Sequence, residues 1–315
     1  MADQANRSHA VDAYPTRMPA MEHWLERKDP VVWAHEEPKA PLTEEMVADF
    51  DRDGFLILRD LFSEDEVNAL QEESRALRAG ERALDPESLI TEPESEAVRT
   101  VFQLELQSPV FARLAADKRI AGAISHLLDD QVYVHQSRLN YKPGFTGKEF
   151  YWHSDFETWH AEDGMPRMRA ISASVLLTDN DALNGPLMLI PGSHKTFVAC
   201  AGETPDQNYK SSLKKQEIGV PSHDTLADMA DQHGIEYASG KAGTVILFDC
   251  NTLHGSNGNI TPFPRSNAFF VYNAWANRPK APFAAAHYRP EFLGVREPHE
   301  PLSIVSGPIR SGQNQ

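Results

Sequence analysis

The sequence predicts a mainly β fold with flanking helices, and three features of the chain support this prediction. Up to about residue 130, the apolar residues follow helical spacing. Beyond that point, apolar and polar residues alternate in short segments, which is typical of strands. No helical pattern separates these segments, so we expect an antiparallel barrel or sandwich instead of a parallel sheet with crossover helices.

The region before residue 41 is rich in proline and polar residues. We expect an arm that packs partly on the body, with Trp24 and Trp33 as anchors. The rest is predicted to form a single domain. Its expected parts are a mainly helical support at 41–130, a β core at 131–280 that carries an insertion at 201–240, and a C-terminal segment at 281–315.

Two helices in the support have clear start signals. The first is expected to begin after Thr43, which can cap it, with Leu42 packing on Val47 as a hydrophobic staple. Gly54 ends this helix, and a short apolar strand follows. The second begins after Ser63, where S-x-x-E forms a capping box, and ends near Gly80. A further helical pattern covers residues 109–128.

The predicted core strands are short segments with a period of two. Their sequences are QVYVHQSRLNYKP, EFYWHSD, ISASVLLTD, LMLIPGSHK, GTVILFD and SNAFFVYNAW. The polar insertion 201–240 interrupts them. A long insertion between barrel strands often forms a lid, and a disordered surface loop is the other reading.

Composition excludes several classes of protein. A net charge of −16, spread along the chain, argues against a nucleic-acid partner. No run of about 18 apolar residues predicts a membrane span. The first residues lack the pattern of a secretory signal, and Cys200 and Cys250 cannot form a disulfide framework. We therefore expect a cytoplasmic protein.

Three H-x-[DE] triplets occur, against about two expected by chance, so the triplet alone identifies nothing. His153 and Asp155 follow a strand-like segment, in which residues two apart point to the same face and can chelate one metal ion. The other two triplets, at 35–37 and 160–162, are expected on the surface.

A third ligand is expected from a distant segment. His254 follows the GTVILFD strand across a turn, so a second strand can deliver it to the same site. Two imidazoles and one carboxylate form the ligand set of non-haem Fe(II) oxygenases. Arg265 begins the next strand, which we expect to lie beside the segment after His254. A guanidinium there is well shaped to bind a carboxylate.

At this point the chain resembles a known family. The segment FDRDGFLILRDLFSEDEVNAL, the HSD triplet, PGSHK and the spacing of His254 and Arg265 are similar to the phytanoyl-CoA dioxygenase superfamily of Fe(II)- and 2-oxoglutarate-dependent oxygenases. The resemblance covers roughly residues 43–275. Within it, the motif WHSDFETWHAEDGMP resembles the ectoine hydroxylases, which convert the compatible solute ectoine into 5-hydroxyectoine.

The resemblance implies a double-stranded β-helix, the jelly-roll of the cupins, with His153, Asp155 and His254 as iron ligands and O2 as oxidant. It further implies residues that bind 2-oxoglutarate, namely Arg265, Ser256, Phe150, Lys142 and Asn140. The residues that it implies for ectoine are Gln136, Trp159, Thr158 and Arg289. A homodimer is also expected.

Two other functions stay open from the sequence. The same chemistry could act on another small solute or on a free amino acid such as proline. A non-catalytic β-helix protein that binds a metal or a solute is the alternative from another class. A related halogenase is disfavoured because those enzymes lack the carboxylate ligand, whereas Asp155 is present.

Overall fold

The computed structural model describes residues 12–18, 21–91, 98–213 and 215–310. The first eleven residues of the predicted arm and the last five of the predicted C-terminal segment therefore lie outside the described residues.

The strands are β1 His23–Glu26, β2 Phe55–Leu58, β3 Leu89–Thr91, β4 Val98–Phe102, β5 Val132–Lys142, β6 Phe150–His153, β7 Ala170–Leu176, β8 Leu187–Leu189, β9 Thr196–Ala199, β10 Glu236–Ala238, β11 Val245–Asp249, β12 His254–Ser256 and β13 Arg265–Ala274. The α-helices are α1 Glu44–Asp53, α2 Glu64–Arg78, α3 Leu104–Gln107, α4 Pro109–Ala115, α5 Ala123–Leu128, α6 Asp155–Thr158, α7 Tyr209–Ser212 and α8 His223–His233.

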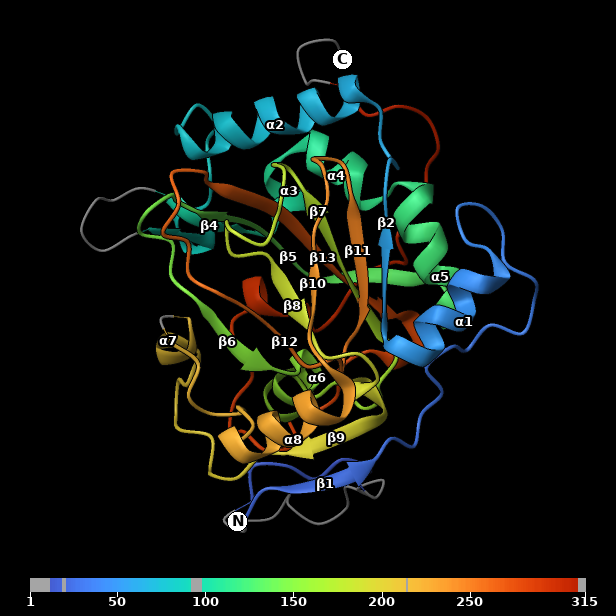
Figure 1. The fold of residues 1–315 in the computed structure, drawn as a ribbon, viewed down its shortest axis with the longest axis vertical. Helices are drawn as coiled ribbons and strands as arrows, with labels where there is room; N and C mark the ends of the chain where they lie inside the picture. Colours follow the sequence, from blue (N-terminus) through green and yellow to red (C-terminus); the bar gives the residue numbers. More distant parts are fainter. Residues whose placement is uncertain (1–11, 19–20, 92–97, 214, 311–315) are drawn as a thin grey trace.

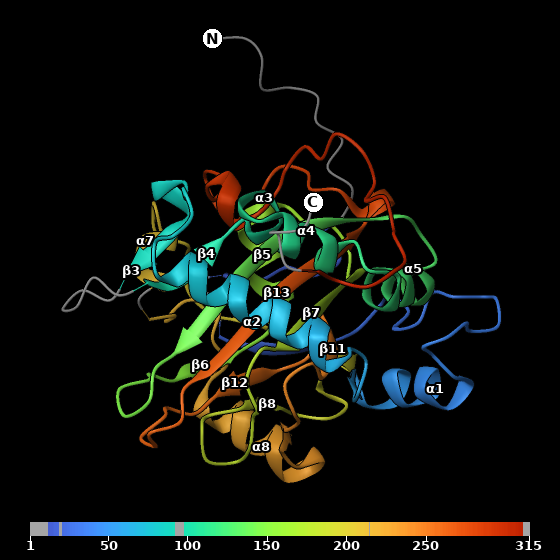
Figure 2. The ribbon, with the colours of Figure 1, turned by 90° about the horizontal axis from the view of Figure 1, so that it is seen from above.

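Two antiparallel sheets face each other and form a double-stranded β-helix, as predicted. The larger sheet has the order β2-β11-β7-β13-β5-β4-β3, and the smaller has the order β10-β8-β12-β6. Figure 2 shows helices α2 to α5 on one side of the larger sheet, with β6, β12 and β8 on its other side. The larger sheet is thus the middle layer of the fold.

The two faces of the larger sheet carry different side chains because residues two apart on a strand share a face. The outer face is apolar and packs against the helices, with residues such as Val175, Leu247 and Phe270 in one buried cluster. Toward the smaller sheet, Phe248 and Phe269 pack with apolar residues of β8. Much of that inner face is polar, and this is where the site lies.

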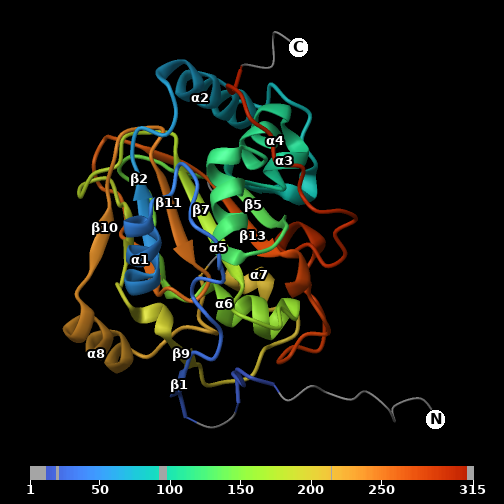
Figure 3. The same cartoon turned by 90° about the vertical axis from the view of Figure 1, so that its right-hand side faces the viewer.

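The expected caps of the first two helices are confirmed. Thr43 accepts a hydrogen bond from the backbone N–H of Met46, and Gly54 ends α1 in the left-handed conformation. Ser63 and Glu66 form both bonds of the capping box at the start of α2. Figure 3 shows α1 beside β2, and α2 above α3 and α4.

The helical pattern predicted for 109–128 is confirmed, but the structure divides it into separate segments. The chain forms α4, then a π-helical turn at Lys118–Gly122, then α5. Asp117 causes the break because its carboxylate accepts from the backbone N–H of Arg119 and also pairs with the side chain of Arg113. A side chain that bonds to the backbone in this way starts a new helix instead of continuing the old one.

The first 130 residues also contain more β-structure than predicted. Strands β3 and β4 extend the larger sheet, with Thr100 opposite Asn140 and Val101 opposite Leu139 of β5. The expected arm is ordered where it is described. Its strand β1 pairs with β9 at the end of the molecule opposite α2 (Figure 1).

The two tryptophans of the arm contact the body. The indole of Trp24 donates to Thr225, and the guanidinium groups of Arg167 and Arg169 both lie over the ring of Trp33. The insertion 201–240 forms α7, α8 and β10, and β10 extends the smaller sheet, so the reading of a disordered loop is wrong for its described residues. No helix formed by the described residues is long and apolar enough to cross a membrane.

Replacing Gly54 should destabilise the fold strongly. Its φ is +81°, and an added Cβ would lie 2.4 Å from His194 Nδ1 and 2.8 Å from Thr252 Oγ1. Gly80 is the matched control because its φ is +72° but no atom lies within 4 Å of the added Cβ. Backbone strain alone costs roughly 1–2 kcal/mol for either substitution. We expect Gly54→Ala to lose about 2 kcal/mol more than Gly80→Ala in urea unfolding, and equal losses would contradict this packing.

Candidate active site

Three side chains converge between the two sheets. The imidazoles of His153 and His254 and the carboxylate of Asp155 each offer one ligand atom, and these atoms all lie within 4.8 Å of one another. Nε2 of His153 is 3.5 Å from Asp155 Oδ1, and Nε2 of His254 is 3.8 Å from Asp155 Oδ2. The three predicted metal ligands are therefore brought together.

The local backbone differs from the single strand on which the sequence analysis placed His153 and Asp155. His153 is the last residue of β6, but Asp155 is the first residue of α6, so the two do not share one strand face. The chain turns at Ser154, and this turn brings the carboxylate back toward the imidazole. His254 begins β12 and is the direct antiparallel partner of His153. Strand pairing, not alternation along one strand, places the imidazoles together.

Both imidazoles have the orientation that a metal ligand requires. Nδ1 of His153 lies 2.7 Å from the carbonyl of Tyr151, and Nδ1 of His254 lies 2.9 Å from the carbonyl of Thr252. A carbonyl can only accept, so each Nδ1 carries the proton and donates it. In its neutral form each imidazole then presents the lone pair of Nε2 toward Asp155. Such backbone bonds orient most metal-binding histidines.

The charge states also suit a metal. Burial is the largest cause that lowers the pKa of His254, to about 4, so its imidazole is neutral at pH 7. For Asp155, burial acts to raise the pKa, but the imidazoles of His254 and His153 outweigh burial and hold the pKa well below its usual range. Neutral imidazoles and an ionised carboxylate are the forms that bind divalent metal ions.

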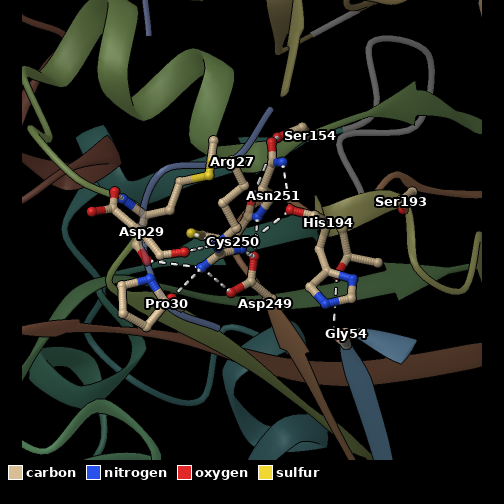
Figure 4. A network of polar contacts seen from close by, with 12 residues as sticks. Arg27, Asp29, Pro30, Gly54, Ser154, Ser193, His194, Asp249, Cys250 and Asn251 are labelled. Atoms are coloured by element: carbon tan, nitrogen blue, oxygen red, sulfur yellow. Dashed lines mark hydrogen bonds and ion pairs between the residues drawn. The ribbon is translucent and has the colours of Figure 1, made fainter. Parts of the chain in front are cut away.

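A buried polar network joins the two segments that carry these ligands (Figure 4). Asn251 accepts a hydrogen bond of 2.9 Å from the hydroxyl of Ser154, and it donates to the carbonyls of His194 and Thr196. Ser154 lies between the first two ligands, and Asn251 lies three residues before the third. The bond from Ser154 to Asn251 therefore fixes the distance between the segments.

Arg27 of the arm extends this network through Asp249. Arg27 binds Asp249, the last residue of β11, through two bonds of 2.7 and 3.0 Å. It also donates to four backbone carbonyls, those of Asp29, Pro30, Met168 and His194. The carboxylate of Asp249 in turn accepts from the backbone N–H of Asn251. A fully bonded guanidinium thus holds the turn that leads to His254 (Figure 4).

A group of buried cations lies at one end of the polar inner face. Arg265 and Lys142 are direct partners on β13 and β5. Nζ of Lys142 donates to Ser256 Oγ at 2.9 Å and so links the larger sheet to β12. The expectation that the Arg265 strand lies beside the segment after His254 is wrong, because β13 pairs with β5 and β7, while β12 lies in the other sheet. Lys142 provides the connection instead.

Neither of these cations forms an ion pair with a carboxylate among the described residues. Burial lowers the pKa of Arg265 to about 10, and no carboxylate offsets this effect. Burial, and then the charge of Arg265, lowers the pKa of Lys142 to about 7. Two buried and destabilised cations side by side form a site that favours a carboxylate ligand.

The other two residues implied for 2-oxoglutarate lie near this group. Phe150 is the partner of Ser256 across β6 and β12, and its ring centroid is 5.5 Å from Nζ of Lys142. Asn140 shares its strand face with Lys142 but accepts a hydrogen bond from Thr100. Phe150 therefore contacts the cationic group directly, whereas Asn140 faces toward β4.

A cavity of about 90 Å³ opens beside His153 and Asp155. All four residues implied for the substrate line it, namely Gln136, Thr158, Trp159 and Arg289. Trp159 is 2% exposed and packs edge-on against His135. The guanidinium of Arg289 binds both oxygens of Asp163, at 2.7 and 2.5 Å, so its charge is already paired.

Sequence reasoning missed Arg138, which lines the same cavity. Its guanidinium lies over the ring of Phe269, its Nε finds no hydrogen-bond partner among the described residues, and burial lowers its pKa. The signal was present, because Arg138 lies on β5 between Gln136 and Asn140 and therefore shares their face. From the insertion, Asn208 and Gln216 also line the cavity.

One of the two discarded triplets is not on the surface. His35 and Glu37 are exposed as expected. His160 is fully buried and Glu162 is 3% exposed, so that expectation is wrong. The ring of His160 stacks on Phe283 at 4.0 Å, and its nitrogens contact Asp12 and the carbonyl of Met165. This histidine is a packing residue, and Glu162 faces the cavity.

A double-stranded β-helix with two imidazoles and one carboxylate converging in its interior defines the class of non-haem Fe(II) oxygenases. Comparison with known families agrees, since the model of phytanoyl-CoA dioxygenase (PhyH) matches residues 50–267. The chain belongs to the phytanoyl-CoA dioxygenase family.

Over nearly its whole length, the chain is also similar to proteins named ectoine dioxygenase. The one from Sphingopyxis alaskensis is 57% identical over 95% of this chain and 97% of its own length. The one from Stutzerimonas stutzeri is 53% identical over 93% of this chain and 97% of its own length. A crystal structure of EctD from S. alaskensis with 2-oxoglutarate and 5-hydroxyectoine is 53% identical, with a TM-score of 0.86 over 95% of this chain and 99% of that chain. A crystal structure of the same protein with bound Fe gives the same TM-score and coverage at 52% identity.

Removing the side chain of Asn251 should weaken metal binding without unfolding the chain. Asn251→Ala breaks the bond to Ser154 and frees two carbonyls, so the two ligand segments lose their fixed separation. We expect roughly a 10- to 100-fold lower affinity for Fe(II) in an anaerobic titration. The control is Asn180→Ala, which removes another buried asparagine far along the chain from these ligands. Equal losses in the two variants would show that the network has no special role.

Proposed function

We propose that this chain is an Fe(II)- and 2-oxoglutarate-dependent dioxygenase that hydroxylates ectoine to 5-hydroxyectoine, with release of succinate and CO2. The observation that carries the proposal is the set of two Nε2 atoms and one carboxylate with both Nδ1 protons bound to backbone carbonyls. The relatives named ectoine dioxygenase, which align with nearly the whole chain, support the choice of substrate.

His153, Asp155 and His254 would hold the metal. Three protein ligands leave further positions of an Fe(II) ion open. The bound ion would supply the site at which 2-oxoglutarate and O2 react, and this chemistry belongs to the cofactor and the co-substrate. The protein itself binds, orients and shields the reactants.

The cationic group places the co-substrate. Arg265 and Lys142 would bind the carboxylate of 2-oxoglutarate that lies away from the metal, and Ser256 would donate its hydroxyl beside them. Phe150 would form an apolar wall for the short carbon chain, with Asn140 further along the same strand. Among the described residues neither of these two cations forms an ion pair with a carboxylate, and burial lowers the pKa of both.

The cavity on the other side of His153 and Asp155 would hold the substrate. Ectoine is a small cyclic amidine with a carboxylate, so its site needs a cation, an amide and an aromatic wall. Gln136 and Trp159 would supply the amide and the wall, with Thr158 beside them. We assign the carboxylate to Arg138, because the charge of Arg289 is engaged by Asp163.

The positions of the cations assigned to the two carboxylates also determine how 2-oxoglutarate and ectoine would be oriented. Lys142 and Arg138 share one face of β5 but lie at different points along it, and Arg265 lies beside Lys142 on β13. Each ligand would therefore present its carboxylate to its own cation and its reactive carbon toward the triad. Residues of the insertion, including Leu213 and Ile218, line the cavity and would exclude water from it. A homodimer and a cytoplasmic location remain predictions from the sequence.

The function is tested by product analysis. The chain is loaded with Fe(II) and 2-oxoglutarate without oxygen, and then ectoine and O2 are added. We expect one added oxygen atom in ectoine and one succinate for each product, measured by mass spectrometry. Asp155→Ala should abolish both because it removes one metal ligand. Oxygen added to proline or to another solute, but not to ectoine, would keep the fold class and refute the substrate.

The proposed role of Lys142 predicts a pH dependence. Its pKa of about 7 in the free protein reflects burial and the charges of Arg265 and Arg99, against the opposing effect of Glu149. Lys142 is charged below pH 7 and loses its proton above it, while a bound carboxylate favours the charged form. The Kd for 2-oxoglutarate should therefore rise between pH 7 and 9, by up to about tenfold per pH unit.

The measurement is an anaerobic titration of the Fe(II)-loaded protein with 2-oxoglutarate at several pH values. Lys142→Met keeps the length of the side chain but has no charge, so it should bind more weakly and with a Kd that is flat over this range. A steep pH dependence that persists in Lys142→Met would contradict the assignment.

A further inference from the structure

Arg17 belongs to the arm, far from the motifs that identify the site, yet its side chain is fully buried. Its guanidinium binds Glu157 in bidentate fashion, with Nε to Oε1 at 3.0 Å and Nη2 to Oε2 at 2.8 Å. Its third nitrogen, Nη1, binds Glu162 Oε1 at 2.5 Å. One arginine therefore joins two carboxylates of the segment that follows the triad residue Asp155.

These two carboxylates bracket the substrate residues. Glu157 precedes Thr158 and Trp159, and Glu162 follows them. The segment is α6 with the π-helical turn Trp159–Asp163, and a π-helical turn has weaker intrinsic stability than α-helix. The two carboxylates that Arg17 binds therefore flank the part of the segment that carries Trp159. Arg17 Nη2 also lies 3.4 Å from Thr158 Oγ1.

Arg17 connects the same segment to the insertion. Its Nη1 donates to Thr204 Oγ1, and Asn208 donates to the oxygen of Glu162 that Arg17 also binds. Asn208 and Glu162 both line the substrate cavity. At Gly219, an added Cβ would lie 2.1 Å from Glu157 and 2.9 Å from Arg17, so the chain of the insertion passes close to this pair. Two walls of the cavity thus depend on one guanidinium.

The charge balance makes Arg17 hard to replace. Both carboxylates are almost fully buried, at 1% and 4% side-chain exposure, and their ion pairs are both with Arg17. Without it, two buried carboxylates would repel each other next to the cavity. A lysine would keep the charge but has no planar fork to bind one carboxylate at two points while reaching another.

We propose that Arg17 is a positioning residue that fixes the substrate half of the active site, and this inference rests on the proposed function. Arg17 acts through Glu157 and Glu162 on Trp159 and on the insertion, and it touches neither the metal ligands nor the cations assigned to 2-oxoglutarate. It also lies before residue 50, where the family match begins, so it is outside the segment that the family model describes. The arm then serves substrate placement as well as stability.

The test is a comparison of the two substrates in Arg17→Lys. We expect the KM for ectoine to rise roughly 10- to 100-fold, because small displacements of a positioned group have effects of this size. The KM for 2-oxoglutarate and the Fe(II) affinity should stay within about twofold of the wild type. The ratio of 5-hydroxyectoine to succinate should fall, since a poorly held substrate lets co-substrate turn over alone. Glu157→Gln, which keeps the shape of the carboxylate, should likewise raise the KM for ectoine and leave the KM for 2-oxoglutarate unchanged.

The control is Arg167→Met. Arg167 also joins the arm to the body, through Asp29, but it does not line the cavity, so both KM values should be unchanged. An unchanged KM for ectoine in Arg17→Lys, or an equal rise in both KM values, overturns the role of Arg17. Failure of the proposed function is a separate result, because then the wild type itself makes no 5-hydroxyectoine.

Discussion

The pairing of β6 with β12 is the constraint on which the rest of the site depends. It sets His153 directly opposite His254, although the two residues are distant in the sequence. Each imidazole is then turned by a bond from Nδ1 to a carbonyl two residues earlier, so both Nε2 atoms face the carboxylate of Asp155. A shift of one residue in this pairing would move one imidazole to the other face of the sheet.

The larger sheet separates two charged regions. Along the inner face of β5, Gln136 and Arg138 lie at the substrate cavity, whereas Lys142 lies at the other end beside Arg265. Burying such groups is unfavourable in the free protein, as the lowered pKa values of Lys142 and Arg265 indicate. Anionic ligands would relieve this cost. A polar interior that is destabilising without ligands is thus a source of binding energy and of ligand orientation.

Much of this site follows from the sequence because ligand types and short motifs are local properties, although alternation on one strand was the wrong reason to join His153 and Asp155. The triad, the cationic group and the cavity residues Gln136 and Trp159 were found from motifs and from the family resemblance. The pairing of strands is not local, so the expectation that the Arg265 strand lies beside the segment after His254 was wrong. Arg138 was missed, although alternation on β5 marks it.

Other features had no signal in one sequence. Arg17 and Arg27 come from a proline-rich arm whose composition suggests a loose segment, yet both guanidinium groups are buried against acidic residues far along the chain. Glu162 reads as part of a surface turn until the fold places Arg17 beside it. Buried ion pairs between distant segments depend on tertiary structure, which neither composition nor periodicity encodes.

The most direct test is an anaerobic crystal structure with Fe(II), 2-oxoglutarate and ectoine. The account predicts an ion bound by Nε2 of His153, Nε2 of His254 and a carboxylate oxygen of Asp155, at about 2.0–2.2 Å. It predicts the distal carboxylate of 2-oxoglutarate on Arg265 and Lys142, and the carboxylate of ectoine on Arg138 beside Trp159. A metal bound through Nδ1, or the two ligands in exchanged positions, would contradict it.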